Sequence, residues 1–528
     1  MRQEETTMPT LEWIGKDKVV NHHQQVPYRV LEAQYTHNAE RSENMIIRGD
    51  NLEALKSLLP KYEGKVKCIY IDPPYNTGNE GWVYNDNVND PKIKKWLGEV
   101  VGKEGEDLSR HDKWLCMMYP RLKLLQKLLS EEGAIFISID ENESANLKLI
   151  CNEIFGQNKH IATFVWQKRY SPDARTAISD AHEYIYCYAK NPDLFKESRH
   201  LLPLTGAQTK QFSNPDKDPR GPWKADNFTA PGYRPNQMYE ITLPSGRVVV
   251  PPQGRCWRVT KEGFDKFTAD KRMVYGNDGN GAPSVKRFLN EMPGMVPWTW
   301  WNHEEVGHTQ EGNKLLATIM DKVVFDYPKP VRLIERILHI ASDSDSIVLD
   351  SFAGSGTTAH AVLNKNKADG GKRRFILVEM DNYADTITAE RVKRVIDGYG
   401  SGKNAVPGTG GDFTFYDLGE ALLLPNGNLN ENVSADKIRE YVYYMETREA
   451  MESIANGNPY FLGASRGAAY YFYYEKEAIT TLDHDFLATI PERADSYVIY
   501  ADLCTIPTDE LVKYNITFKK IPRDIAKL

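Results

Sequence analysis

The segment between residues 346 and 378 constrains the fold of this chain most tightly. Residues 346–350 have the apolar character of a buried strand, a turn with glycines at positions 354 and 356 follows, and a helix begins near residue 357. A second strand follows at residues 374–378. Two strands joined through a helix form a βαβ unit of a parallel sheet. The segment therefore predicts an open α/β fold.

A similar strand exit lies much earlier, where the apolar run 66–70 continues into the sequence IDPPYNTG at residues 71–78. Two prolines cannot continue a sheet ladder or a helix interior, so the chain leaves this strand stiffly and in extended form. Ligands usually bind just beyond the carboxyl ends of strands in open α/β sheets. The carboxylate of Asp72 and the ring of Tyr75 are therefore expected at the rim of the sheet, although a merely stiffened strand exit would use the same residues.

Apolar periodicity predicts the other elements of this sheet. Strands are expected at 45–48, 133–140, 161–167 and 184–189. Helices are expected at 115–129, 142–155 and 330–340, and a last helix ends near residue 398. Asp50 is well placed as the N-cap of a helix that contains Leu52, Leu55 and Leu58. Residues 79–112 lack clear periodicity and are expected to form a long loop.

A length of 528 residues implies about two to four domains. The α/β core is expected in two parts, at 44–190 and 321–399, because residues 191–320 are rich in Pro, Gly, Asn, Trp and basic residues with few periodic segments. We expect an irregular N-terminal extension at 1–43, a glycine-rich linker at 400–411 and a separate domain of mixed strands and helices at 412–528.

Composition excludes several protein classes. With 41% hydrophobic and 26% charged residues, the chain resembles ordinary soluble globular proteins. No run approaches the roughly 18 apolar residues that span a bilayer, and the N-terminus lacks the apolar core of a secretory signal. Six scattered cysteines without a C-x-x-C pair argue against a disulfide framework or a zinc site, and they fit the reducing cytoplasm.

The formal net charge of -7 is unevenly spread. Residues 163–320 contain 21 Lys and Arg against 17 Asp and Glu, whereas residues 411–528 contain 11 against 19. The middle of the chain could therefore face phosphates. Basic residues there are interleaved with aromatic ones, a mix that can contact phosphates and base edges, although each is also compatible with an ordinary surface or core position. They are Arg169, Arg175, Lys210, Lys224, Arg234, Arg255, Arg258, Lys286 and Arg287, with Trp223, Tyr233, Trp257 and Trp298.

The glycine turn predicts a ligand of a particular kind. Gly354 and Gly356 permit a tight turn and a close approach of a ligand to the backbone. A phosphate-binding Walker loop requires a lysine that this turn lacks. Glu379 ends the next strand, where an acid commonly holds the two hydroxyls of a ribose. Without a third glycine, the pattern favours a nucleoside with a sulfonium tail over a dinucleotide.

The two strand exits together resemble the amino-group DNA methyltransferases that use S-adenosylmethionine. The acid-first sequence DPPY is similar to the adenine-specific branch, and its position before FAGSG resembles the permuted β class. Longer segments resemble the modification subunits of type III restriction–modification systems over nearly the whole chain. These are GDNLEAL, IDPPYNTG, YPRLKLLQKLL, GAIFISIDENE, FDYPKPVRLI, FAGSGTTAHAV, FYDLGEALL, YADLCTIP and FKKIPRDI.

This resemblance implies a Rossmann-like, S-adenosylmethionine-dependent methyltransferase sheet with a circularly permuted motif order. A target-recognition region would be inserted at 191–320, and a C-terminal α+β domain would serve assembly. The target base would be held by Asp72, Pro73, Pro74 and Tyr75. The cofactor would contact Asp50, Lys329, Phe352, Ala353, Gly354, Ser355, Gly356, Thr357 and Glu379, although Asp50 could instead be only a helix cap.

The implied activity is transfer of a methyl group to the N6 amine of adenine in duplex DNA, without a metal. Implied partners are double-stranded DNA, a second copy of the chain and a restriction subunit, because the chain has no Walker lysine motif or convincing nuclease cluster of its own. Three alternatives stay open: an adenine methyltransferase without a restriction partner, methylation of the N4 amine of cytosine or another amine, and a binding protein that only retains the fold.

Overall fold

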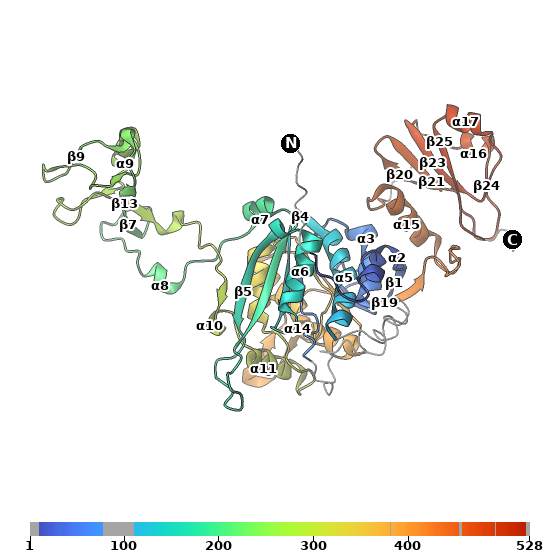
Figure 1. The fold of residues 1–528 in the computed structure, drawn as a ribbon, viewed down its shortest axis with the longest axis horizontal. Coiled ribbons are helices and arrows are strands. Elements are labelled where there is room, and N and C mark those ends of the chain that lie inside the picture. Colours follow the sequence, from blue (N-terminus) through green and yellow to red (C-terminus); the bar gives the residue numbers. More distant parts are fainter. Residues whose placement is uncertain (1–9, 78–109, 381, 453–456, 492, 524–528) are drawn as a thin grey trace. The chain divides into compact units, whose positions relative to one another are not determined.

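A computed structural model describes residues 10–77, 110–380, 382–452, 457–491 and 493–523 (Figure 1). These residues belong to two compact units. The main unit comprises residues 1–200 and 298–528, and the inserted unit comprises residues 201–297. Most of the loop expected at 79–112 lies outside the described residues, and residues 110–112 already belong to helix α5 (Arg110–Leu128).

The main unit is built on a ten-stranded sheet. The spatial order is β1 (Arg29–His37), β19 (Phe413–Ala421), β2 (Met45–Arg48), β16 (Arg374–Glu379), β15 (Ile347–Asp350), β3 (Val66–Ile71), β4 (Leu129–Ile139), β6 (His182–Ala189), β5 (His160–Gln167) and β14 (Trp300–Trp301). Neighbours from β19 to β4 in this order pair in parallel, whereas β1 pairs antiparallel with β19, β6 with β4 and β5 with β6.

The two strand exits found in the sequence lie side by side. Strands β15 and β3 are neighbours, with Val348 opposite Cys68 and Leu349 opposite Ile69. From β15 the chain passes through α13 (Thr357–Asp369) to β16 on one side, and from β3 it passes through α5 to β4 on the other. Such a switch in direction opens a crevice at the carboxyl ends of the strands, where ligands bind in this class of sheet.

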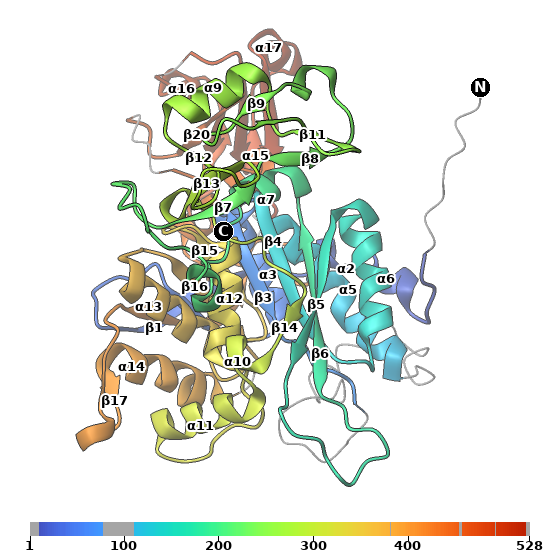
Figure 2. The ribbon, with the colours of Figure 1, turned by 90° about the vertical axis from the view of Figure 1, so that its left-hand side faces the viewer.

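Helices cover both faces of the sheet. Helices α3 (Asn51–Tyr62), α5 and α6 (Ser144–Phe155) lie on one side, and α12 (Val331–Ala341), α13 and α14 (Glu390–Asp397) lie on the other (Figure 2). All six residues of β3 are buried, as expected for a parallel strand covered on both faces. Successive side chains alternate between the two faces, so Ile69 and Ile71 pack in the cluster that also contains α3 and α5.

Residues 16–37 of the N-terminal segment form secondary structure, contrary to the irregular extension expected at 1–43, of which residues 1–9 lie outside the described residues. This segment contains α1 (Lys16–Val19) and α2 (His22–Gln25), which pack near α5, and the edge strand β1. Strand β1 pairs with β19, which in turn pairs with β2. The first part of the segment 412–528 is therefore a strand of the main sheet, because the buried Phe413 and Phe415 need the cover of that sheet.

The rest of the C-terminal segment is an α+β fold. Its four-stranded sheet has the order β20 (Phe461–Ser465), β21 (Ala468–Phe472), β23 (Ser496–Ala501) and β25 (Ile516–Lys520), with helices α15 (Ala435–Thr447), α16 (His484–Ala488) and α17 (Thr508–Lys513). The aromatic run 470–474 is largely core. Tyr471 is fully buried, and Phe472 and Tyr474 are 2% and 8% exposed.

The expected linker is also partly ordered into secondary structure. Strand β17 (Gly398–Tyr399) pairs antiparallel with β18 (Val406–Pro407), and a short 3-10 turn at Gly402–Asn404 lies between them. The chain therefore turns back on itself before it enters β19. Residues 400–411 connect α14 to the main sheet rather than to a detached domain.

The inserted unit is smaller than the region 191–320 expected from composition. Helix α7 (Pro192–Ser198) packs on β4, β14 pairs with β5, and α11 (Thr309–Met320) packs on α14, so these flanks belong to the main unit. The inserted unit contains α8 (Gly206–Thr209), β7 (Trp223–Asn227), β8 (Thr229–Pro231), β9 (Ile241–Thr242), β10 (Val248–Val249), β11 (Arg255–Trp257), α9 (Lys261–Ala269), β12 (Met273–Val274) and β13 (Ser284–Phe288). Phe228, Trp257 and Phe264 form its core.

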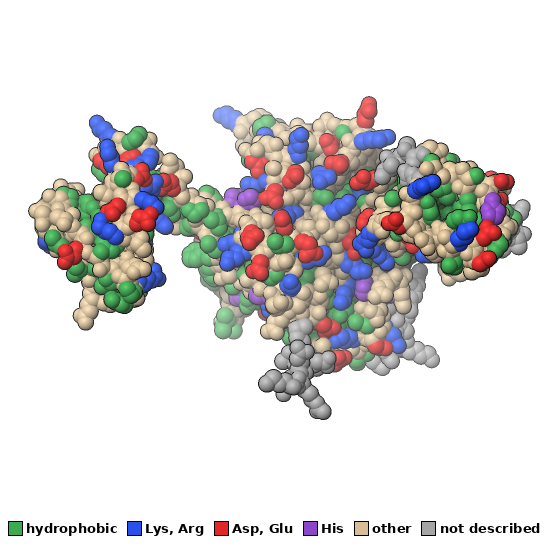
Figure 3. Space-filling model, turned by 90° about the horizontal axis from the view of Figure 1, so that it is seen from above, with side chains coloured by type: hydrophobic (Ala, Val, Ile, Leu, Met, Phe, Trp, Pro, Cys, Tyr) green, Lys and Arg blue, Asp and Glu red, His purple; other side chains and the backbone are tan. Residues whose placement is uncertain are grey.

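Charged side chains of both signs are interspersed over the face drawn in Figure 3. Among the described residues, no helix is long and apolar enough to cross a bilayer.

Candidate functional site

The first half of the site is the turn after β3, which a neighbouring helix holds in place. The indole Nε1 of Trp114 on α5 donates a hydrogen bond of 2.7 Å to the carbonyl oxygen of Pro74. The hydroxyl of Tyr75 donates to Asp72 Oδ1 at 2.8 Å, and Lys329 Nζ donates to Asp72 Oδ2 at 2.6 Å. Two prolines and these anchors give the Asp72 carboxylate a defined position at the edge of the sheet.

The second half is the glycine turn between β15 and α13. Gly354 has a φ of 51° and Gly356 a φ of 80°, so both lie in the left-handed region that glycine tolerates. A Cβ on Gly354 would lie 3.2 Å from Phe325 Cζ. The backbone N–H of Gly354 donates to Glu379 Oε2 at 2.8 Å, which fixes the carboxylate that ends β16. The sequence thus builds a tight cradle with an acid beside it.

Both halves open into one cavity of about 350 Å³, a size found for small-molecule sites. All but two of the residues that the sequence singled out line it: Asp72, Pro73, Pro74, Tyr75, Lys329, Phe352, Ala353, Gly354, Ser355, Thr357 and Glu379. Gly356 instead caps α13 behind the cavity wall. The two motifs, 278 positions apart from Asp72 to Asp350 in the chain, therefore form a single site.

Asp50 is the other residue that does not line the cavity. Its carboxylate caps α3 by accepting from the backbone N–H groups of Leu52 at 2.8 Å and Glu53 at 3.3 Å. The cavity is lined instead by the next residue, Asn51, whose Nδ2 donates to the carbonyl oxygen of Ser351 at 3.0 Å. Asn51 thus ties the start of α3 to the glycine turn, and Asp50 holds that helix start in place.

Charged residues that the sequence did not single out for this site also line the cavity, among them Arg121, Asp140, Lys168 and Glu183. Asp140 follows β4 directly, so the strand-end argument that identified Glu379 could have found it. Glu183 interrupts an otherwise apolar strand, which is also a readable signal. Arg121 and Lys168 carry no such signal, because their burial depends on contacts between distant segments.

Lys329 connects the two halves of the site. Its ammonium lies 5.0 Å from the ring centre of Tyr75 and 5.9 Å from that of Trp166, within the range of cation–π attraction. Its backbone carbonyl accepts a hydrogen bond from Thr357 Oγ1 at 3.4 Å, at the start of α13. The side chain therefore lies on the Asp72 side, whereas its backbone lies on the side of the glycine turn.

Burial controls the acid–base behaviour of the cavity. It raises the pKa of Asp72 above its usual value, while the charge of Lys329 acts in the opposite direction. Burial also raises the pKa of Asp350 to about 7, although Thr358 Oγ1 donates to this carboxyl at 2.5 Å. Likewise, burial raises the pKa of Asp140 to about 6. Carboxyl groups perturbed in this way cluster at functional sites more often than elsewhere.

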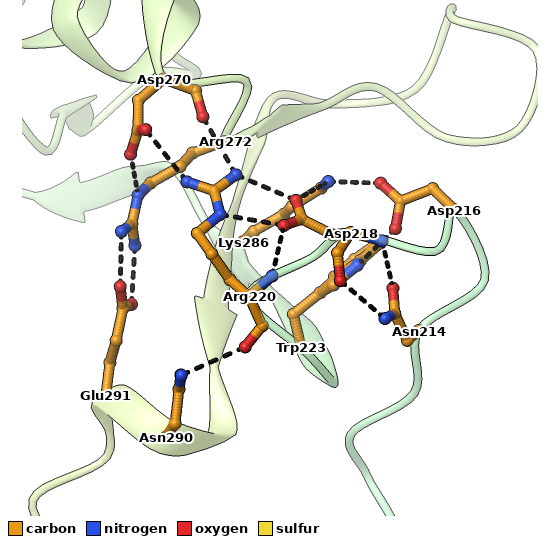
Figure 4. A network of polar contacts seen from close by, with 10 residues as sticks. All are labelled: Asn214, Asp216, Asp218, Arg220, Trp223, Asp270, Arg272, Lys286, Asn290 and Glu291. Atoms are coloured by element: carbon orange, nitrogen blue, oxygen red, sulfur yellow. Dashed lines mark hydrogen bonds and ion pairs between the residues drawn. The ribbon is translucent and has the colours of Figure 1, made fainter.

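Polar groups in the inserted unit form a different arrangement (Figure 4). Arg220 donates to both oxygens of Asp218 at 2.9 Å, Lys286 also pairs with Asp218 at 2.9 Å, and Arg272 pairs with Glu291. Elsewhere in the unit, Arg258 pairs with Asp226 at 2.9 Å, and Arg287 lies 3.4 Å from the same carboxylate. Several of the basic residues expected to contact phosphates are therefore already paired with acids of the same unit.

The sheet and its cavity define a doubly wound α/β protein with a small-molecule site at the topological switch point. The model of the DNA methylase family N6_N4_Mtase matches residues 66–390, which is more than half of the chain. The chain therefore belongs to this DNA methylase family. The matched range includes the turn after β3, the glycine turn and Glu379.

Curated relatives agree with this assignment. The chain is 35% identical to the Mod subunit of the type III restriction-modification enzyme StyLTI of Salmonella typhimurium, over 73% of this chain and 62% of the relative. It is 34% identical to the EcoPI Mod subunit of Escherichia phage P1, over 70% and 63% of the two chains. It is also 30% identical to the type II methyltransferase M.KpnI of Klebsiella pneumoniae, over 65% of this chain and 82% of the relative.

The chain thus matches less than two thirds of the length of these type III Mod subunits. Among solved structures, it is similar to the cytosine-N4-specific DNA methyltransferase PvuII, with 12% identity, a TM-score of 0.36 and coverage of 69% of this chain and 89% of that one. Such a low similarity adds nothing to the family assignment.

Proposed function

We propose that this chain transfers a methyl group from S-adenosylmethionine to the N6 amine of adenine in duplex DNA, as the modification subunit of a restriction–modification system. The observation that supports this most is the meeting of the Asp72 turn and the glycine turn in one cavity. The first offers a fixed carboxylate for an amine, and the second offers a cradle and an acid suited to a nucleoside. The family assignment and the Mod subunits among the relatives agree with this reading.

The exocyclic amine of adenine is a poor nucleophile because its lone pair is delocalised into the ring. We propose that Asp72 and the carbonyl oxygen of Pro73 accept hydrogen bonds from its two N–H groups. These hydrogen bonds favour a tetrahedral geometry at the nitrogen. The localised lone pair then forms the new N–C bond as the bond from the methyl carbon to sulfur breaks, and the surplus proton leaves the nitrogen for Asp72 or water. Fixed acceptors of this kind act without reorganisation during the reaction.

S-adenosylmethionine would supply the electrophilic methyl group. Glu379 would accept its ribose hydroxyls, and the turn from Phe352 to Thr357 would surround the rest of it. The cradle fits such a ligand, because glycine at position 354 keeps this wall of the cavity open towards Phe325. Tyr75 would stack on the target base, which must leave the duplex at a cost of about a few kcal/mol.

The N4 amine of cytosine is the second candidate acceptor, because the same two hydrogen-bond acceptors would suit it. Incubation of the protein with DNA and labelled S-adenosylmethionine, followed by digestion to nucleosides and mass spectrometry, separates the two. We expect N6-methyladenine. Labelled N4-methylcytosine would overturn the base assignment, and the absence of label in any nucleoside would overturn DNA methylation itself.

The remaining partners follow from the same proposal. Residues 201–297 would read the DNA sequence, and the C-terminal α+β fold would support self-association and docking of a restriction subunit. Truncation after residue 425, which retains β19, tests the assembly role by light scattering. A truncated protein that still dimerises would contradict it. An adenine methyltransferase without a restriction partner is the alternative, and it would form no complex with a restriction subunit.

A further inference from the structure

Each oxygen of the carboxylate proposed to hold the target amine already accepts one hydrogen bond. Tyr75 Oη donates to Asp72 Oδ1 at 2.8 Å, and Lys329 Nζ donates to Asp72 Oδ2 at 2.6 Å. The ammonium and the carboxylate are only 10% and 25% exposed, so water competes weakly with this ion pair. A carboxylate has about four lone-pair sites, so an amine can also bind to Asp72, but Asp72 accepts from it more strongly if one of these two donors finds another acceptor.

Glu183 offers that acceptor to both donors. Tyr75 Oη lies 3.0 Å from Glu183 Oε2, and Lys329 Nζ lies 3.7 Å from the same oxygen. The pairing of β6 with β5, in which Glu183 lies opposite Trp166, fixes the position of this residue. Its other oxygen, Oε1, lies 3.4 Å from Lys168 Nζ, which holds Oε2 towards Lys329. Glu183 is 8% exposed and contacts no residue of the glycine turn in any of these interactions.

The geometry points to Glu183 as a positioning residue that takes Lys329 from Asp72 when the target amine enters. This inference rests on the proposed methyl transfer. A shift of about 1 Å by the ammonium would turn the 3.7 Å contact with Glu183 into a charge-assisted hydrogen bond. Lys329 stays between two carboxylates throughout, so the exchange moves no net charge into or out of the cavity. Asp72 Oδ2 then becomes the acceptor for one N–H of the amine.

The exchange has a consequence that a purely structural role of Glu183 would lack. Without the second carboxylate, Lys329 stays on Asp72 and competes with the amine. Glu183→Gln preserves the size of the side chain and removes the charge. We expect it to lower kcat by about 10- to 100-fold, the range that corresponds to one hydrogen bond to a charged group. The Kd for S-adenosylmethionine should change less than about twofold, because the Asp72 side of the cavity is not its site.

A double-mutant cycle tests the inference with Glu183→Gln, Lys329→Met and the double variant, by single-turnover transfer at saturating S-adenosylmethionine. If Glu183 acts by drawing Lys329 away from Asp72, Glu183→Gln should change the transfer rate by less than about threefold in the Lys329→Met background. Asp180→Asn is the matched control. It removes a carboxylate that pairs with Lys168 at 2.7 Å and is not a partner of Lys329 in these contacts, so it should leave kcat nearly unchanged.

Two results would overturn the inference about Glu183 and leave the proposed function standing. One is multiplicative loss, in which Glu183→Gln lowers kcat by the same factor with and without Lys329. The other is a wild-type rate for Glu183→Gln in an otherwise active enzyme that Asp72→Ala inactivates. A wild-type protein that transfers no methyl group to DNA would overturn the proposed function, and the inference with it.

Discussion

Acidic side chains have opposite environments in the cavity and in the inserted unit. In the cavity, burial raises the pKa of Asp72 and brings that of Asp350 to about 7. In the inserted unit, hydrogen bonds from Arg220 lower the pKa of Asp218, and hydrogen bonds from Arg272 lower that of Asp270. In the cavity, burial outweighs the hydrogen bonds that these carboxyl groups accept, whereas in the inserted unit the hydrogen bonds from arginine outweigh burial. Substitutions in the two places should therefore have different effects.

Asp72→Ala should have the largest effect. It removes the acceptor that we propose for the target amine, and we expect kcat to fall by about a hundredfold or more, as when one transition-state hydrogen bond is lost. Radiolabelled methyl transfer to DNA measures this loss. The Kd for S-adenosylmethionine should stay near the wild-type value. Substantial activity in this variant would remove Asp72 from the mechanism.

Gly354→Val should break the opposite half of the site. A side chain at this position meets Phe325 and must adopt a φ of 51°, so the turn cannot keep its shape. We expect the Kd for S-adenosylmethionine to rise by about tenfold or more, since strain at such a position costs on the order of 1–3 kcal/mol. Isothermal titration calorimetry measures it. Gly370→Val is the control, because a Cβ there meets nothing within 4 Å at a similar φ of 70°.

Tyr75 allows the ring and the hydroxyl to be tested separately. Tyr75→Ala should weaken binding of the flipped base by about 1–3 kcal/mol, the range for base–aromatic stacking. Tyr75→Phe keeps the ring and loses the hydroxyl with its hydrogen bonds to Asp72 and Glu183, so its effect should be smaller. Fluorescence of 2-aminopurine at the target position reports the flipped state. An equal loss of flipped-base binding in the two variants would argue against stacking by the Tyr75 ring.

The raised pKa of Asp350 predicts how the stability of the protein depends on pH. Its folded pKa of about 7 lies above the usual value, so the folded protein holds this proton more tightly than the unfolded chain does. The stabilisation is present below the unfolded pKa and is lost as the pH rises towards 7. Urea denaturation should show that the free energy of unfolding falls more from pH 5 to pH 8 in the wild type than in Asp350→Asn. Identical pH dependence would contradict the buried, protonated state.

Glu291→Gln should have the smallest effect. It weakens an exposed pair with Arg272 in the inserted unit, and such pairs contribute about 0.2–1 kcal/mol. We expect a small drop in the free energy of unfolding in urea and an unchanged kcat. A large loss of kcat would mean that the ion pairs of Figure 4 do more than stabilise this unit.

The sequence predicted what local chemistry determines. The prolines after Asp72 and the glycines at 354 and 356 specify their turns without help from distant residues, so both halves of the cavity were expected. Glu183 was readable as an acid in a strand, but its approach to Lys329 was not, because it depends on the antiparallel pairing of β6 with β5. Strand β19 was assigned to a separate domain because nothing in residues 413–421 specifies β1 and β2 as partners. The sequence predicted Asp50 as a helix cap, whereas its place outside the cavity lining needed the structure.

We propose that one cavity holds two separable halves, an amine-binding half at Asp72 and a nucleoside-binding half at Glu379. The Kd for S-adenosylmethionine and the single-turnover rate, measured on the same preparations of Asp72→Asn and Glu379→Gln, test this division. We expect Asp72→Asn to lose transfer and keep the Kd, whereas Glu379→Gln should raise the Kd and recover transfer at high concentrations of S-adenosylmethionine. The reverse pattern, with cofactor affinity lost in Asp72→Asn and unchanged in Glu379→Gln, would contradict it.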